Sequence, residues 1–234
     1  MQYKNPYIEL CIEGASSIFR GLSQADKEVL NQHHLVVNFS KRDTILSQGS
    51  KPKGLICLVS GKAKIFKIGA GNREQIIKML RPLSFINYRS LFSDNYYPFS
   101  VVAVEESAIV IFEKKALLRL LKQNAELAVK FLKVVSEDLL FSNNRLVSLT
   151  QKHVRGRLAE SLLLLRDTYG VEADGKTMRV MLSREDIAHF SNMTTSNAIR
   201  TLSGMVSEKI LDIQGRKLMI LNPQKLETIS ESGQ

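Results

Sequence analysis

The stretch from Leu182 to Ile220 constrains the fold of this chain most, because it combines two helix signals, a turn and two short apolar runs. Ser183 precedes a first turn that contains two acidic residues. A serine oxygen and nearby carboxylates satisfy the free amides and the dipole at a helix N-terminus. The pattern predicts a helix that ends near Phe190, a turn over residues 191–193 and a second helix capped by Thr194.

The second predicted helix has one apolar face and one polar face. Ala198, Leu202 and Met205 or Val206 recur at three- and four-residue steps, so we expect them to face inward. A helix with small polar groups near its N-terminus and one long cation a turn later can enter the major groove of DNA. The outer face carries Thr195, Ser196, Asn197, Ile199 and Arg200.

The residues after Lys209 form two apolar runs around a Gln-Gly-Arg-Lys turn. Such runs predict a β-hairpin with a basic tip, which we interpret as the wing of a winged helix-turn-helix. The stretch therefore indicates a DNA-binding module. An alternative stays open, because similar short helices and hairpins occur in domains that bind no nucleic acid, and Thr194 can serve only as a helix cap.

Composition sets broad limits on the remaining chain. A length of 234 residues with 44% hydrophobic content allows two domains with their own cores. The chain has no apolar run of about eighteen residues and its start lacks the layout of a signal peptide, so we expect a cytoplasmic protein. Cys11 and Cys57 are too few for a disulfide framework or a four-cysteine metal site, and we expect two buried thiols.

The net charge of +10 suits a polyanionic partner, but its distribution does not locate the DNA-binding half. Residues 150–234 hold 12 Lys and Arg against 10 Asp and Glu, whereas residues 1–149 hold 21 against 13. Much of the excess lies between Lys41 and Lys78. The function must therefore be argued from the placement of a few cations.

The N-terminal part changes from helical to β-like texture. Residues 16–34 have helix-like spacing, and from Leu35 short β-like runs follow one another between glycine-containing turns. This predicts a sandwich or barrel of antiparallel strands, the sensor domain, over residues 1–123.

A long helix is predicted over residues 124–150, and the helix-turn-helix domain over residues 151–234. About 26 helical residues span roughly 39 Å, more than one domain needs, so an apolar stripe on this helix would suit a dimer interface. The alternative is that the stripe packs only on its own β domain. A further helix over Lys152–Tyr169 and a hairpin over residues 171–182 complete the prediction. The stripe consists of Leu127, Phe131, Val134 or Val135, Leu139, Leu146 and Leu149.

The whole pattern, from about Phe19 to Ile220, resembles the Crp/Fnr family of bacterial transcription regulators. The motifs that carry the likeness are TILSQG, GLICLVSGKAKIF and GNREQIIKMLRP in the sensor, then GRLAESLLLL and LSREDIAHFSNMTTSNAIRTLSGMVSEKIL followed by GRK. The resemblance implies an α+β fold with an N-terminal double-stranded β-helix or jelly-roll-like sensor, a long dimerisation helix and a C-terminal winged helix-turn-helix. It also implies a homodimer on two-fold symmetric DNA, with RNA polymerase as a further partner that it allows.

The resemblance assigns roles to residues of the helix-turn-helix. Thr195, Ser196 and Arg200 match positions that contact base edges, and Arg200 is the principal candidate because a guanidinium bonds guanine O6 and N7 together. Thr195 and Ser196 replace a long charged pair, so the best-known consensus site of the family is not expected. The positions that contact phosphates are matched by Arg184, Thr194, Asn197, Gly215 and Arg216.

The sensor departs from the cyclic-nucleotide-binding members of the family. Those members need a Gly-Glu pair and an Arg followed by Ser or Thr to hold the phosphate. Asn87 and Tyr88 stand at the first pair, and Pro98 and Phe99 at the second. We therefore expect no cyclic AMP binding. Two cysteines are too few for an iron-sulfur cluster, and we expect no metal and no other cofactor. The candidate effector pocket, which holds another effector or is filled by its own side chains, consists of Phe85, Asn87, Tyr88, Arg89, Phe99, Ser142 and Asn143.

The leading prediction is a homodimeric, sequence-specific DNA-binding transcription regulator without enzymatic activity, since no nucleophile, metal or acid-base constellation appears. Its control would come from an effector other than cyclic AMP or from no effector. The second hypothesis is a small-molecule-binding module that uses its helix-turn-helix for protein contacts.

Overall fold

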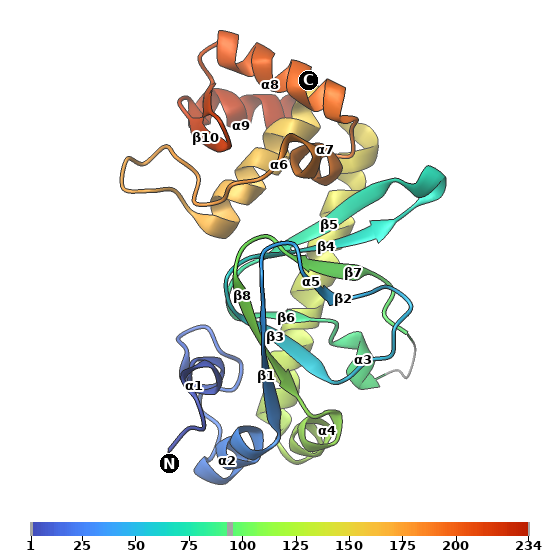
Figure 1. The fold of residues 1–234 in the computed structure, drawn as a ribbon, viewed down its shortest axis with the longest axis vertical. Coiled ribbons are helices and arrows are strands. Elements are labelled where there is room, and N and C mark those ends of the chain that lie inside the picture. The colour runs from blue at the N-terminus through green and yellow to red at the C-terminus, as the bar shows by residue number, and fades with distance from the viewer. Residues whose placement is uncertain (1, 93–95, 234) are drawn as a thin grey trace. The chain divides into compact units, whose positions relative to one another are not determined.

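The computed structural model describes residues 2–92 and 96–233, which form two compact units (Figure 1). One unit contains the residues up to Lys67 together with Leu80–Leu140. The other contains Ile68–Met79 together with residues from Phe141 onward. The end of one β-hairpin therefore packs with the C-terminal elements. The domain limits of the sequence analysis stay a prediction.

The first unit opens with two helices, of which only the second was predicted. Helix α1 spans Pro6–Glu13 and begins at Asn5, whose side chain accepts a hydrogen bond from the Ile8 amide at 2.9 Å. Helix α2 spans Gln24–Gln32, and Ser23 caps it by accepting from the Asp26 amide. Cys11 and Cys57 are buried free thiols, as predicted.

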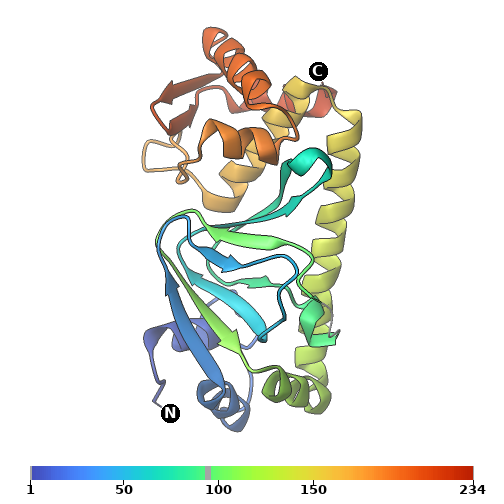
Figure 2. The same ribbon diagram turned by 45° about the vertical axis from the view of Figure 1, so that its right-hand side comes forward.

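Eight strands of the first unit and its hairpin form two four-stranded sheets, which confirms the predicted antiparallel β-roll (Figure 2). The pairs β1–β8, β3–β8, β3–β6, β2–β7 and β4–β7 are antiparallel. The first sheet has the order β1 (His34–Phe39), β8 (Ser107–Phe112), β3 (Leu55–Ser60) and β6 (Ser84–Ile86). The second has the order β2 (Thr44–Leu46), β7 (Ser100–Ala103), β4 (Ala63–Ile68) and β5 (Glu74–Leu80), with the 3₁₀ turn η1 (Ala70–Asn72) between β4 and β5.

Two hydrophobic clusters lie on opposite sides of the first sheet. Leu55, Cys57 and Val59 of β3 belong to one cluster, which also contains residues of α1, of helix α4 (Lys114–Gln123) and of helix α5 (Ala125–Gln151). Ile56 and Leu58 belong to the other, with residues of the second sheet. Because alternate residues of a strand point to opposite faces, the five residues Leu55–Val59 of β3 are all apolar and buried.

The helices that end the first unit include the long helix of the sequence prediction. They are α3 (Arg89–Phe92), α4 (Lys114–Gln123) and α5 (Ala125–Gln151). Of the residues predicted to form one apolar stripe on α5, Leu127 and Phe131 are buried in the core of the β-roll. Leu139 and Leu146 are instead more than 60% exposed. The helix therefore has a core-facing apolar segment and a separate exposed apolar face.

The second unit contains the predicted winged helix-turn-helix. Its elements after α5 are α6 (Val154–Tyr169), α7 (Arg184–Phe190), α8 (Thr195–Ser207), β9 (Leu211–Gln214), β10 (Lys217–Ile220) and the unpredicted α9 (Pro223–Ser232). The hairpin predicted over residues 171–182 is present in reduced form: an antiparallel bridge pairs Val171 with Met178 around a turn, and a second bridge pairs Thr177 with Met219. In α6, Leu158, Ala159, Leu162 and Leu165 are buried, as predicted.

In the described ranges 2–92 and 96–233, the model has no helix whose length and hydropathy would let it cross a membrane.

Candidate nucleic-acid interface

Helix α7 begins at a capping box, as the sequence indicates. The Ser183 hydroxyl accepts from the Asp186 amide at 3.0 Å, and the Asp186 carboxylate accepts from the Ser183 amide at 3.4 Å. These reciprocal bonds satisfy two of the amides that a helix N-terminus leaves free. The start of the helix-turn-helix is therefore fixed by local chemistry.

The turn between α7 and α8 is buried at its ends and left-handed in its middle. Ser191 and Met193 are buried, and Asn192 between them has φ +50°. The Met193 amide donates to the Ala188 carbonyl at 3.0 Å, which closes the turn onto α7. Thr194 then caps α8 by accepting from the Asn197 amide at 3.3 Å. The predicted cap role is confirmed, and the hydroxyl hydrogen of Thr194 stays available for a phosphate oxygen.

Helix α8 buries one face and leaves the other free. Ala198, Leu202 and Met205 are at most 1% exposed, so they anchor the helix as predicted. Ser196 and Arg200 are exposed and four residues apart, which puts them on one side of the helix. Thr195 and Asn197 are half-buried at the first turn. The predicted base-contacting and phosphate-contacting residues of α8 thus lie together at its N-terminal half.

Ile199 is a further surface residue of α8 that was not predicted to contact DNA. Its side chain is 47% exposed, directly before Arg200. An exposed apolar group on this face can contact a thymine methyl group. Its spacing on the helix places it on the same side as Ser196.

The wing is a two-residue hairpin. Gln214 pairs with Lys217, so Gly215 and Arg216 form the turn, and Gly215 adopts φ +61°. A glycine at the first turn position allows this conformation without strain. Arg184 of α7 donates from Nη2 to the Gly215 carbonyl at 3.1 Å. The phosphate-contact candidates Arg184, Gly215 and Arg216 are therefore brought together.

Cations of the second unit differ in whether a carboxylate pairs with them. On α6 and α9, Arg155 and Lys225 both pair with Glu208, at 2.7 and 3.2 Å. In the part of the chain that the structure describes, no carboxylate lies within ion-pair distance of Arg200, Arg216 or Lys217, and all three are exposed. Arg200 on α8 and Arg216 and Lys217 at the wing therefore present positive charge to a polyanion.

The residues of the candidate effector pocket have different local surroundings, and the pocket itself stays a prediction. Phe85 packs against the hydrophobic cluster that contains residues of α1, α4 and α5, and its ring centroid lies 5.7 Å from that of Phe19 and 6.2 Å from that of Phe131. Phe99 packs against the other core cluster. Tyr88 donates to Asp138 of α5 at 2.6 Å, and burial together with this hydrogen bond raises the pKa of Tyr88. The remaining four candidates are buried Asn87, with φ +57°, and exposed Arg89, Ser142 and Asn143.

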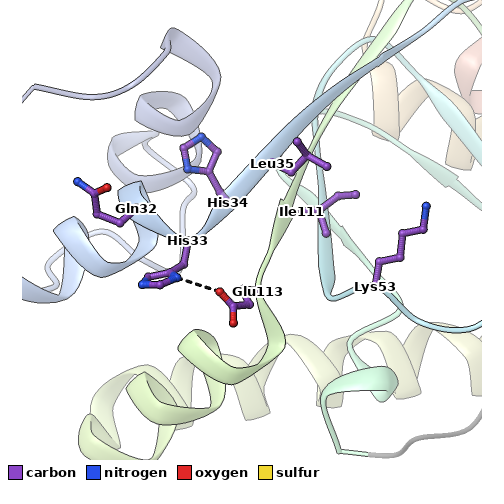
Figure 3. A pocket seen from close by; sticks show the side chains of 7 residues that line it. All are labelled: Gln32, His33, His34, Leu35, Lys53, Ile111 and Glu113. Atoms are coloured by element: carbon purple, nitrogen blue, oxygen red, sulfur yellow. Dashed lines mark hydrogen bonds and ion pairs between the residues drawn. The ribbon is translucent and has the colours of Figure 1, made fainter.

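Two hollows of the first unit are lined by other residues. One, of about 300 Å³, lies beside the α2–β1 junction and is lined by His33, Glu113, Lys53 and four neighbours (Figure 3). His33 Nδ1 lies 2.8 Å from Glu113, while His34 Nε2 lies 3.0 Å from the Asn5 side chain. The two histidines point apart. The other, of about 370 Å³ and almost wholly apolar, is lined by residues of α3, α4 and α5.

Comparison with known proteins assigns the family. Residues 36–124 match the cyclic nucleotide-binding domain, and residues 156–229 match the Crp-like helix-turn-helix domain. The chain belongs to the Crp/Fnr family of transcription regulators. The family prediction made from the motifs is thereby confirmed.

Relatives along nearly the whole chain are transcription regulators. A CRP-like cAMP-activated global transcriptional regulator of Mycobacterium tuberculosis is 24% identical over 213 residues, 90% of this chain and 95% of the relative. The global nitrogen regulator of Nostoc is 26% identical over 198 residues, 82% of this chain and 87% of the relative. These relatives are regulators and not enzymes, which agrees with the sequence prediction.

A solved structure shows the same fold. FixK2 from Bradyrhizobium japonicum superposes with a TM-score of 0.75 at 19% identity, covering 84% of this chain and 96% of FixK2. The order of β-roll, long helix and winged helix-turn-helix in this Crp/Fnr chain is therefore the fold of known proteins.

Proposed function

We propose that this Crp/Fnr regulator binds DNA sequence-specifically through the exposed face of α8, with the wing on the flanking phosphates. The observation that carries the proposal is the unpaired positive charge of Arg200 and Arg216 beside a helix whose other face is anchored. A bidentate guanidinium bond to guanine contributes about 1–3 kcal/mol of discrimination. Thr195 and Ser196 are short and can donate or accept, so they discriminate between bases less strongly than Arg200.

The regulator acts as a homodimer in this proposal, with α5 as the shared interface. Leu132, Leu139 and Leu146 are each exposed by 61–67% and recur every seven residues. A seven-residue apolar repeat on a long helix is the pattern of a two-stranded coiled coil. Val129, Leu140 and Val147 widen this exposed face. A second copy that covers it would place two recognition helices on a symmetric site.

The sensor of this regulator responds to something other than cyclic AMP in this proposal, or acts without an effector. Asn87 and Tyr88 lack the charge and small size that a phosphate cradle requires, and Pro98 and Phe99 provide no guanidinium. Phe85 already packs between Phe19 and Phe131, which favours a site filled by its own side chains. This distinguishes the chain from its cAMP-activated relative of Mycobacterium tuberculosis.

The test compares Arg200→Ala with wild type on a site selected by wild type. We expect the variant to lose preference for this site over scrambled DNA and to keep weak binding to both, because the phosphate contacts remain. Arg166→Ala is the matched control. Arg166 pairs with Glu227 at 3.1 Å, and its replacement removes the same charge from α6. Full specificity in Arg200→Ala would show that another element contacts the bases.

A further inference from the structure

The last carbonyl groups of α7 accept hydrogen bonds from the local turn and from distant side chains. A helix leaves its last four carbonyl groups without partners inside the helix. Here the Ile187 and Ala188 carbonyls accept from the Ser191 amide, at 3.1 and 3.2 Å, as part of the local turn. The His189 and Phe190 carbonyls instead accept from side chains far away in the sequence. These two carbonyls immediately precede the turn that sets the direction of α8.

Arg145 of α5 supplies one of the two distant donors. Its Nη2 donates to the Phe190 carbonyl at 2.6 Å, and its guanidinium carbon lies 4.8 Å from the centre of the Phe190 ring. Nη1 lies 3.7 Å from Glu160 of α6, which also pairs with Lys152 at 2.8 Å. The Arg145 side chain is only 7% exposed. It is therefore held inside the second unit and is not available to a DNA phosphate.

A buried arginine is costly unless its charge and its hydrogen bonds are compensated. Burial lowers the pKa of Arg145, and the neighbouring Glu160 carboxylate opposes this effect. Removing the guanidinium would leave the Phe190 carbonyl without its donor and Glu160 with one cation fewer. The position thus depends on a long, forked cation rather than on apolar packing.

Gln75 supplies the other donor, from the hairpin segment Ile68–Met79 that belongs to the second unit. Its Nε2 donates to the His189 carbonyl at 2.7 Å and to the Ile76 carbonyl at 3.0 Å. Glu74 lies beside it, 3.6 Å from Nδ1 of His189. The hairpin and α5 thus reach successive carbonyls of the same helix end.

We propose that Arg145 and Gln75 form a clamp on the carboxyl end of α7 that fixes the turn and aims α8 at the DNA. Arg145 is then a positioning residue, acting through Phe190 and the turn over residues 191–193. Base contacts require side chains to be held within about 0.5 Å of their productive place, so a loosened turn lowers specific binding. The inference rests on the proposed DNA-binding function and adds the residues that orient the recognition helix.

The experiment measures specific and non-specific DNA affinity of the full chain, against salt, for Arg145→Met and Gln75→Met. We expect each to weaken binding to the wild-type-selected site about five- to tenfold, at the lower end of the range typical of energetic coupling between sites. Binding to scrambled DNA and the salt slope should stay unchanged, because neither residue contacts phosphate. The double variant should lose less than the product of the single losses, since both side chains hold one turn.

Two further variants keep the clamp falsifiable if Arg145→Met fails to fold. Arg145→Lys retains the charge, so it should fold, but its ammonium lacks the planar fork and should recover only part of the specific affinity. Arg166→Met removes the same charge from a pair outside the turn and should bind like wild type. Faster hydrogen exchange at the amides of residues 191–194 in Gln75→Met would support the clamp directly.

Three results would overturn the clamp: unchanged specific affinity in both methionine variants, increased specific affinity, or a salt slope reduced in Arg145→Met. The last would assign Arg145 to a phosphate contact. Absence of any site preference in wild type is a different failure, because it contradicts the proposed function and leaves no specific binding to compare.

Discussion

Replacement of Arg216 by alanine tests the wing and the oligomeric state together. Arg216 is exposed at the two-residue turn between β9 and β10, and in the described residues no carboxylate pairs with it. Each phosphate neutralised by a cation contributes about 0.9 to the slope of log affinity against log salt. A homodimer presents two wings, so the slope should flatten by about 1.8, whereas a monomer would lose about 0.9.

The difference is large enough for a fluorescence anisotropy titration. Between 50 and 200 mM salt, wild type should lose about twelvefold more affinity than Arg216→Ala if two contacts disappear, and about 3.5-fold more if one does. All DNA sequences should be weakened alike, because a phosphate contact carries no sequence information. Arg166→Ala, which breaks a pair with Glu227, should leave the slope unchanged. An unchanged slope in Arg216→Ala would refute the assigned role of the wing.

Three changes within the second unit have outcomes that thermal or urea unfolding can check. Ser183→Ala should lower the free energy of unfolding by about 1 kcal/mol through loss of the α7 cap, and an unchanged melting temperature would contradict the capping box. Lys209→Gly should raise it by about 0.5–1 kcal/mol, because Lys209 has φ +57°, which glycine adopts without strain; a lower melting temperature would contradict this. The turn bonds lower the pKa of Asp174 to about 2, so the stability that its carboxylate contributes is present above about pH 4 and is lost as the pH falls through 2. The urea midpoints of wild type and Asp174→Asn should therefore converge over this interval, and a constant difference would show that the carboxylate charge is irrelevant.

Local signals predicted the helix-turn-helix well. The caps at Ser183 and Thr194 and the spacing of Ala198, Leu202 and Met205 depend on neighbouring residues only, and the structure confirms each. Helices α1 and α9 carry a comparable start signal, although neither helix was predicted. Both begin with an asparagine cap followed by proline, Asn5-Pro6 and Asn222-Pro223, a sequence typical of a helix start.

Spacing does not tell which partner covers an apolar face. Leu127 and Leu139 share the helical period of α5, yet the first is buried in the β-roll and the second is exposed. Spacing likewise does not tell that Phe85 and Phe99 pack against different hydrophobic clusters. The packing of segments distant in the sequence decides which of these side chains are buried together.

The clamp residues could not be predicted from the sequence at all. Arg145 contacts a carbonyl 45 residues away, and Gln75 one that is 114 residues away. Both bonds end on backbone atoms, which carry no residue-type signal. A polar residue at such a position is indistinguishable in sequence from one on a solvated surface.

Selection of bound sequences from random DNA with the purified full chain tests the central claim most directly. The account predicts enrichment of an inverted repeat whose half-sites are about 10 base pairs apart centre to centre, or a multiple of this, because two symmetric recognition helices enter the major groove one turn apart. Enrichment of a single half-site would contradict the homodimer. Recovery of no preferred sequence would contradict specific DNA binding through α8.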